Sequence, residues 1–261
     1  MSDTPPTKKS LGQHWLHDDD ALQAMCDAVG LTPDDTVLEI GPGLGTLTQK
    51  LAVQAKQVVA VEFDAALARD LPKRVHAPNV QVVHQDILQF DLTSLPPSYK
   101  VAANIPYYLT SNLLRQLCEN PNHFSSAALL VQKEVAGRVC AQPGGMSLLS
   151  VSVQFYCQTG LGPVVPAALF TPPPKVDSQI LLLEYRAAPL FPDADTKVFF
   201  RVVKAGFAQR RKTLLNSLSA GLRLGREETA ALLGRANIAP STRAQNLSLQ
   251  QWHALYSAYL L

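Results

Sequence analysis

The sequence lacks the long apolar runs that mark membrane proteins. No stretch approaches the roughly 18 apolar residues of a membrane span, although 47% of the 261 residues are hydrophobic and only 17% are charged. The start, MSDTPPTKKSLGQHWL, contains no hydrophobic segment of signal-peptide length. These absences predict a cytoplasmic protein without a membrane partner. The length allows one large domain, or one domain with a small addition.

Cysteine is also scarce. The four residues Cys26, Cys118, Cys140 and Cys157 form no C-x-x-C pair, and their spacings suit neither a zinc site nor a disulfide framework. We therefore expect reduced thiols in a reducing compartment and no metal centre.

Acidic residues are rare at the C-terminal end. Residues 197–261 hold ten Lys and Arg residues but only two acids, Glu227 and Glu228, while the whole chain has a net charge of just +2. The rest of the chain is therefore acidic. A basic module joined to an acidic one indicates a polyanionic partner.

Apolar runs alternate with helical stretches in the first half of the chain. The strand candidates are 36–41, 57–64, 80–86, 100–105 and 126–132, and helices are expected through Lys50, over 65–75 and over 111–119. Strands that are apolar on both faces and alternate with helices predict an α/β fold with a mainly parallel sheet.

The rhythm changes in the second half. The runs 148–157 and 178–185 read as two further strands, giving seven in all, and TPPPK (171–175) must be an extended loop. A proline-rich linker follows Tyr185, and the pattern from Lys197 onward is helical. We expect a domain over residues 1–187 and a small all-α domain over 188–261.

Glycines follow the first predicted strand in LEIGPGLGTLT. Gly41, Gly43 and Gly45 would let the backbone turn sharply and approach a ligand at the strand end. A dinucleotide fingerprint requires a third glycine where this chain has Thr46. The pattern instead resembles the loop of class I methyltransferases, which bind S-adenosylmethionine. The Glu39 carboxylate is suited to a cationic ligand.

Acids end the next two strands. Glu62 can accept hydrogen bonds from both ribose hydroxyls, and Asp86 suits the exocyclic amino group of adenine. Either acid alone could cap a helix or face water. Together with Glu39, these residues place three acids at successive strand ends, in register with the glycine loop. This arrangement predicts a site for a nucleoside cofactor.

NIPYYL follows the fourth strand. The Asn104 amide can accept the protons of an exocyclic amine, Pro106 fixes the chain direction, and Tyr107 offers a ring for stacking. The tetrad resembles that of the adenine-N6 methyltransferases. In that group an aromatic from a later proline-rich loop forms the opposite wall, which places Phe170 there. The alternative is that Tyr107 and Phe170 are core aromatics and that Asn104 caps a turn.

The motifs LGQHWL, EIGPGLGTLT, VEFD, NIPYYLT, FTPPPKVDS and FAQRRKTLLNSL occur in one order along nearly the whole chain. Together they resemble the small-subunit ribosomal RNA adenine dimethyltransferases, the family whose loss gives kasugamycin resistance. The resemblance implies a class I, Rossmann-like methyltransferase with a small helical RNA-binding domain. It also implies a monomer that dimethylates two adjacent adenines near the end of 16S rRNA, within a partly assembled (pre-30S) subunit.

The resemblance also implies residue roles. Cofactor contacts fall on His14, Leu16, Gly41, Glu62, Asp86 and Asn104, to which the glycine-loop reading adds Glu39 and Gly43. RNA contacts are expected at Lys204, Arg210, Arg211 and Lys212. The family usually has F-G-Q-N-F-L where this chain has Leu11, His14 and Trp15, so either the His14 ring or its backbone alone would serve.

Three rival functions stay open from the sequence. A large-subunit RNA methyltransferase of the macrolide-resistance type shares the glycine loop and NIPY. A non-catalytic RNA-binding or assembly factor could use the same scaffold. A nicotinamide oxidoreductase is disfavoured by Thr46.

Overall fold

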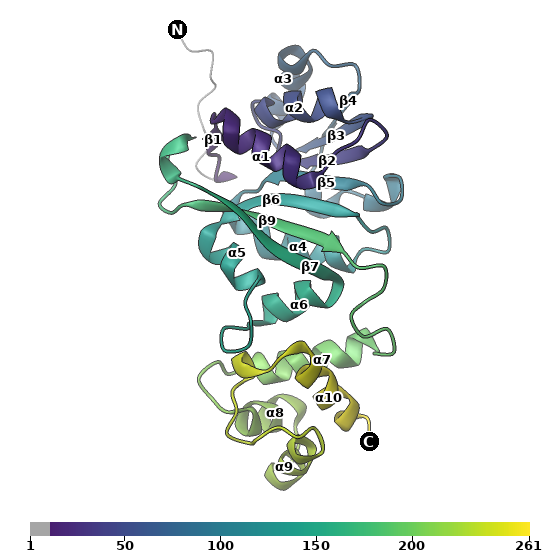
Figure 1. Ribbon diagram of the computed structural model, residues 1–261, viewed down its shortest axis with the longest axis vertical. Helices are drawn as coiled ribbons and strands as arrows, with labels where there is room; N and C mark the ends of the chain where they lie inside the picture. The colour runs from purple at the N-terminus through teal and green to yellow at the C-terminus, as the bar shows by residue number, and fades with distance from the viewer. Residues whose placement is uncertain (1–10) are drawn as a thin grey trace. The chain divides into compact units, whose positions relative to one another are not determined.

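A computed structural model describes residues 11–261 (Figure 1). The chain forms two compact units. Among the described residues, the first contains 11–136 together with Gln158–Tyr185, and the second contains Gly137–Cys157 and Arg186–Leu261. No helix among residues 11–261 is both long and apolar enough to cross a membrane.

A seven-stranded sheet forms the centre of the first unit (Figure 1). Its order is β4 (Val80–His84), β3 (Gln57–Glu62), β2 (Thr36–Ile40), β5 (Lys100–Asn104), β6 (Ser126–Gln132), β9 (Ser178–Tyr185) and β7 (Cys157–Val165). The first five strands pair in parallel, and β9 runs antiparallel to β6. The predicted mainly parallel sheet is therefore confirmed.

Three helices connect parallel strands, as the alternating pattern predicts: α2 (Thr46–Gln54), α3 (Ala65–Val75) and α4 (Thr110–Glu119). In addition, α1 (Asp19–Val29) precedes β2, and α5 (Lys133–Val139) follows β6. Two begin at an aspartate whose side chain accepts backbone N–H groups of the first turn, Asp18 for α1 and Asp64 for α3. Such caps place the helix starts directly after the strand ends.

A second, two-stranded sheet joins the N-terminal segment to the proline-rich region. β1 (Trp15–Leu16) pairs antiparallel with β8 (Phe170–Thr171), so that Leu16 lies opposite Phe170. Both side chains are buried in the hydrophobic cluster beside the sheet.

One predicted strand is wrong. Residues 148–156 form a helix, α6 (Leu148–Tyr156), and the strand β7 begins only at Cys157. The β-branched and aromatic residues favour a strand, but Ser147 and Ser150 form a reciprocal capping box that starts a helix. Tertiary burial then outweighs the weak local preference, because α6 is covered by the aromatic core of the second unit.

The second unit gathers α6 with α7 (Thr196–Phe207), α8 (Leu214–Leu222), α9 (Arg226–Arg235) and α10 (Leu249–Tyr259). Its core is aromatic: the rings of Phe155 and Phe199 lie 5.0 Å apart, and Trp252 is fully buried. Gly137–Cys157 therefore group with the C-terminal helices, whereas the sequence predicts a single domain boundary between residues 187 and 188.

The close approach of α7 and α10 generates a stability prediction. A Cβ on Gly206 would lie 2.4 Å from the buried Trp252 indole. Gly206→Ala should therefore lower the free energy of unfolding by about 1–3 kcal/mol, the usual cost of overpacking. Gly234→Ala is the control, because a Cβ at this helical glycine meets open space. Denaturant unfolding of both variants measures the difference, and equal effects would contradict it.

Candidate active site

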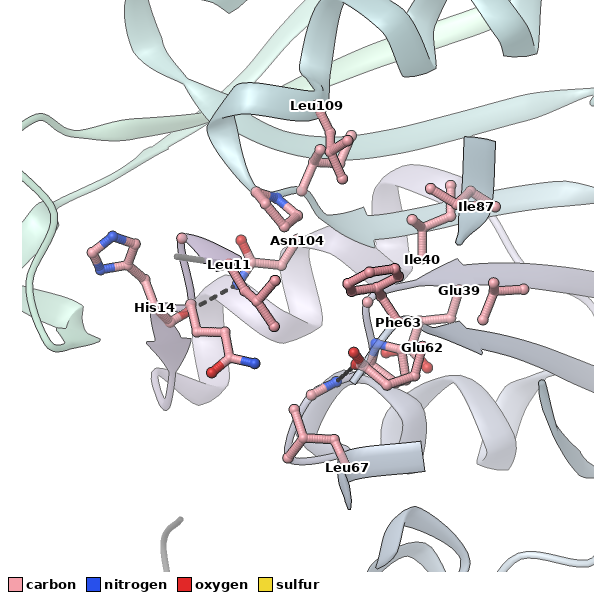
Figure 2. A pocket seen from close by; sticks show the side chains of 18 of the residues that line it. Leu11, His14, Glu39, Ile40, Glu62, Phe63, Leu67, Ile87, Asn104 and Leu109 are labelled. Atoms are coloured by element: carbon pink, nitrogen blue, oxygen red, sulfur yellow. Dashed lines mark hydrogen bonds between the residues drawn. The ribbon is translucent and has the colours of Figure 1, made fainter. Parts of the chain in front are cut away.

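The carboxyl ends of β2, β3, β4 and β5 surround a cavity of about 310 Å³ in the first unit. This volume lies at the lower end of the range for small-molecule sites. Its wall includes most of the predicted residues: His14, Leu16, Glu39, Gly41, Gly43, Glu62, Asp86, Asn104, Pro106 and Tyr107. Figure 2 shows several of these side chains converging from different strands.

The glycine loop adopts a backbone that other residues rarely accept. Gly41, Gly43 and Gly45 have φ values of 67°, 57° and 86°. A Cβ on Gly43 would also lie 2.7 Å from the Trp15 ring, which packs on the loop. Both the left-handed conformation and the close indole therefore require glycine here. The result is a concave strip of backbone at the strand end.

Glu62 organises this loop from the next strand. Its two carboxylate oxygens accept the backbone N–H groups of Gly43 at 3.1 Å and Asp64 at 2.8 Å. Each oxygen keeps a further lone pair, so the carboxylate is held in place yet can still accept hydroxyl donors. Burial raises the pKa of Glu62, and the backbone N–H groups oppose that rise.

Asp86 follows β4 and is half-buried. One of its oxygens accepts the Leu88 backbone N–H at 2.9 Å, which starts a short 3₁₀ turn. The second oxygen is available to a ligand amine. The neighbouring wall is apolar, because Phe63 and Ile87 also line the cavity.

Glu39 is the most deeply buried acid of the site, with only 1% of its surface exposed. Its Oε2 atom has no hydrogen-bond partner among the described residues. Burial raises the pKa of Glu39 to about 8, and the nearby negative charge of Glu62 adds to the rise. A desolvated carboxyl group of this kind is stabilised in its charged form only when a positive charge arrives.

Asn104 ends β5 and is oriented by the N-terminal segment. Its Nδ2 atom donates to the His14 backbone carbonyl at 3.3 Å (Figure 2). Because the amide nitrogen is engaged there, Oδ1 is left as an acceptor. The Pro106 carbonyl accepts the Leu109 N–H at 3.0 Å and retains one lone pair. Both Asn104 and Pro106 line the cavity, and their joint action on an exocyclic amine stays a prediction.

Two predicted site residues, Leu16 and Phe170, have side chains buried in the hydrophobic cluster. Leu16 is buried, and its carbonyl accepts the Thr46 hydroxyl at 3.4 Å. Phe170 is only 3% exposed and does not line the cavity. Its role as a stacking wall stays a prediction, and it would require the ring to leave the hydrophobic cluster beside Leu16.

Several residues that line the cavity were not among the predicted site residues. Trp15 packs on Gly43, Phe63 is 57% exposed at the cavity, and Leu109 completes the side beyond Tyr107. Phe63 could have been identified from the sequence, because a large apolar residue directly after a strand-end acid lies outside the core and is available to a ligand. Trp15 could not, since its partner lies far along the chain.

The predicted RNA-contacting residues belong to the second unit. Arg210, Arg211 and Lys212 are exposed in the turn between α7 and α8. Lys204 lies on α7 and lines a shallow hollow of about 440 Å³ with Lys197, Arg201 and Gly221. No ion pair engages these three α7 cations within residues 11–261. The hollow is therefore strongly positive.

The first cavity fits S-adenosylmethionine. Its glycine strip leaves backbone exposed at the strand end, where a Cβ on Gly43 would collide with the Trp15 ring. Glu62 and Asp86 present oxygens to hydroxyl and amine donors, and Glu39 buries an oxygen without a hydrogen-bond partner among the described residues. Such a set matches a ligand with a ribose, an amino-bearing base and a positive charge.

Comparison with known proteins gives consistent matches. Residues 6–260 match the family described as ribosomal RNA adenine dimethylase. Ribosomal RNA small subunit methyltransferase A of Dehalococcoides mccartyi (strain ATCC BAA-2266 / KCTC 15142 / 195) is 43% identical over 256 residues, covering 97% of this chain and 88% of that protein. The protein of the same name from Shouchella clausii (strain KSM-K16) is 40% identical, with coverages of 96% and 89%.

Solved structures agree on the fold. The 23S rRNA methyltransferase ErmE is 30% identical with a TM-score of 0.77, and the match covers 95% of this chain and 100% of that one. A dimethyladenosine transferase from Plasmodium falciparum is 26% identical with a TM-score of 0.78, with coverages of 93% and 96%. The class I methyltransferase fold and the resemblance drawn from the motifs are confirmed.

The buried Glu39 generates a pH prediction. Its pKa is raised in the folded state, so the folded protein keeps a proton that the unfolded chain has lost. Stability should therefore fall as the pH rises from about 4.5 to about 8, by at most about 1.4 kcal/mol per pH unit. Glu39→Gln should match the parent protein near pH 4 and exceed its stability at pH 8. Urea unfolding across this range measures both, and parallel pH slopes would refute the assignment.

Proposed function

Because this chain belongs to the ribosomal RNA adenine dimethylase family, we propose that it dimethylates N6 of two adjacent adenines near the 3′ end of 16S rRNA. The methyl donor is S-adenosylmethionine. The enzyme acts as a monomer in the cytoplasm, on a partly assembled small subunit. The observation that carries the proposal is the Asn104 amide, oriented by the His14 carbonyl within the cavity that also contains Glu62 and Asp86.

The choice of small-subunit RNA rests on similarity along the whole chain. The small-subunit relative is 43% identical over 97% of this chain, against 30% for the 23S rRNA enzyme. The rival assembly-factor function has less support, because Glu62, Asp86 and Asn104 all line the cavity. A nicotinamide oxidoreductase has no use for the amide at the end of β5.

The cofactor is held by three acids and the glycine strip. Glu62 accepts the ribose hydroxyls, Asp86 accepts the adenine amine beside Phe63 and Ile87, and Glu39 compensates the positive charge. When bound, S-adenosylmethionine supplies a methyl group on a sulfonium that is already activated toward a nucleophile. The chain therefore needs to position that nucleophile and does not need strong acid–base catalysis.

Asn104 prepares the target amine. Adenine N6 is a poor nucleophile because its lone pair is conjugated with the ring. Asn104 Oδ1 and the Pro106 carbonyl accept hydrogen bonds from the N6 protons, which favours a pyramidal N6 whose lone pair is no longer conjugated with the ring. Tyr107 receives the ring after the base leaves its stack, at a cost of a few kcal/mol, and stacking returns about 1–3 kcal/mol.

The decisive experiment uses undermethylated small subunits and labelled cofactor, with mapping of the modified nucleotides. We expect four labelled methyl groups on two adjacent adenines of 16S rRNA. Asn104→Ala should lose at least about a hundredfold in methyl transfer, the scale seen when a positioned hydrogen-bond group is removed from an active site. Its cofactor affinity, measured by calorimetry, should fall far less.

Two outcomes would overturn the proposal. Label confined to large-subunit RNA would identify the rival methyltransferase, and near-normal turnover by Asn104→Ala would remove the amine-positioning role. Absence of label from every RNA, with cofactor still bound, would favour the assembly factor.

The positive hollow on α7 extends the RNA-binding surface beyond the turn that holds Arg210, Arg211 and Lys212. Lys197, Arg201 and Lys204 recur at spacings of four and three, so they share one face of α7. The Arg201 guanidinium also lies 5.9 Å from the centroid of the Tyr259 ring, which holds it in place. Such a row of unpaired cations suits the phosphate backbone of RNA.

This surface predicts a steep salt dependence. Replacing Lys197, Arg201 and Lys204 together by Gln should weaken subunit binding at low salt and reduce the slope of log K against log salt by about two to three. The matched control replaces Lys56, Arg69 and Lys73, three exposed cations of the first unit. Filter binding at several salt concentrations measures both triple variants. Equal losses would show that only net charge matters.

A further inference from the structure

The backbone and the side chain of His14 have different partners. The residue lines the cofactor cavity, and its backbone carbonyl accepts the Asn104 side-chain N–H at 3.3 Å. Figure 2 shows its imidazole turned away from the cavity side chains of Glu39 and Glu62. The ring is therefore not placed to contact the cofactor, although the residue is part of the cofactor wall. Its side chain has a different set of partners.

The imidazole is fixed by the proline-rich loop. Its Nδ1 atom lies 2.6 Å from the Pro172 carbonyl oxygen. Since a carbonyl can only accept, Nδ1 carries a proton and donates it to Pro172. The Pro172 carbonyl and β8 thus hold the ring in one orientation, because β8 is itself paired to β1.

The same ring stacks on Tyr107. The two ring centroids lie 6.0 Å apart with an interplanar angle of 22°, an offset parallel arrangement. At the far end of the tyrosine, its hydroxyl group lies 2.9 Å from the hydroxyl of Ser178, a residue only 1% exposed at the start of β9. Tyr107 is therefore held both along its ring and at its hydroxyl.

We propose that the His14 imidazole is a positioning residue that holds the Tyr107 ring as the platform for the extruded adenine. This inference rests on the proposed function. The backbone of His14 orients the amide that accepts the N6 protons, while its side chain orients the ring that carries the base. One residue thereby sets the distance between the stacking surface and the amine acceptor, and the ordering of Tyr107 is complete before RNA arrives.

Three substitutions separate the two contacts of the ring. His14→Ala removes both, His14→Asn keeps a side-chain N–H for Pro172 without a ring, and His14→Phe keeps a ring without the N–H. We expect kcat to fall about tenfold in the alanine variant, equivalent to about 1.4 kcal/mol, with partial recovery in the phenylalanine variant. The Kd values for cofactor and for subunits should change less than about twofold, because the carbonyl and the phosphate contacts remain.

A double-mutant cycle with Tyr107→Ala tests the coupling. If His14 acts through the tyrosine, adding His14→Ala to Tyr107→Ala should cost little further activity. The control is His123→Ala, because His123 also stacks on a tyrosine, Tyr185, at 4.2 Å and 15° in the same unit but outside the cavity wall. This control should leave kcat unchanged. Fully additive losses, or a loss of cofactor affinity as large as the loss of kcat, would overturn the proposal.

A readout independent of the substrate separates this inference from the proposed function. The chain is labelled with 3-fluorotyrosine, and the Tyr107 fluorine resonance is assigned with Tyr107→Phe. His14→Ala should shift and broaden that resonance, whereas His123→Ala should leave it in place. An unchanged Tyr107 resonance in His14→Ala would refute the positioning role even if 16S rRNA is methylated. A shifted resonance without RNA methylation would refute the proposed function alone.

Discussion

Parallel pairing of β4, β3, β2 and β5 is the constraint on which the site depends. Parallel strands in register end at one edge of the sheet, so residues separated by tens of positions meet there. Glu62 then fixes the glycine loop in place, because its carboxylate accepts backbone N–H groups from both the loop and the start of α3. The carboxylates and the amide are therefore positioned by the sheet before any ligand is present.

The N-terminal segment from Leu11 to Leu16 closes the cavity from outside the main sheet. It is fixed by β1–β8 pairing, by the Asn104 amide and by the contact of Trp15 with Gly43. Each contact comes from a different part of the chain: the proline-rich loop, the end of β5 and the glycine loop. The proposed cofactor wall and the proposed base-binding side consequently share one backbone segment, so a single residue could serve both.

Local pattern was enough to predict the parallel strands, the strand-end acids and the glycine loop, because each depends on short-range periodicity and on the shared polarity of parallel strands. It failed at residues 148–156, where Val and aromatic side chains favour a strand but a serine capping box and burial in the second unit select a helix. It also could not place Trp15 over Gly43 or bury Phe170 beside Leu16. Those contacts depend on long-range packing, which no spacing along the chain encodes.

The orientation of Asn104 also bears on where methyl transfer stops. Its Oδ1 atom can only accept hydrogen bonds, while the nitrogen of the same amide donates to the His14 carbonyl. Adenine offers two protons to such an acceptor and monomethyladenine offers one, but the dimethylated base offers none. Under the proposed mechanism, an acceptor left facing two methyl groups would lose its hydrogen bond without replacement. The hydrogen bonds that position the substrate would therefore favour release of the dimethylated product.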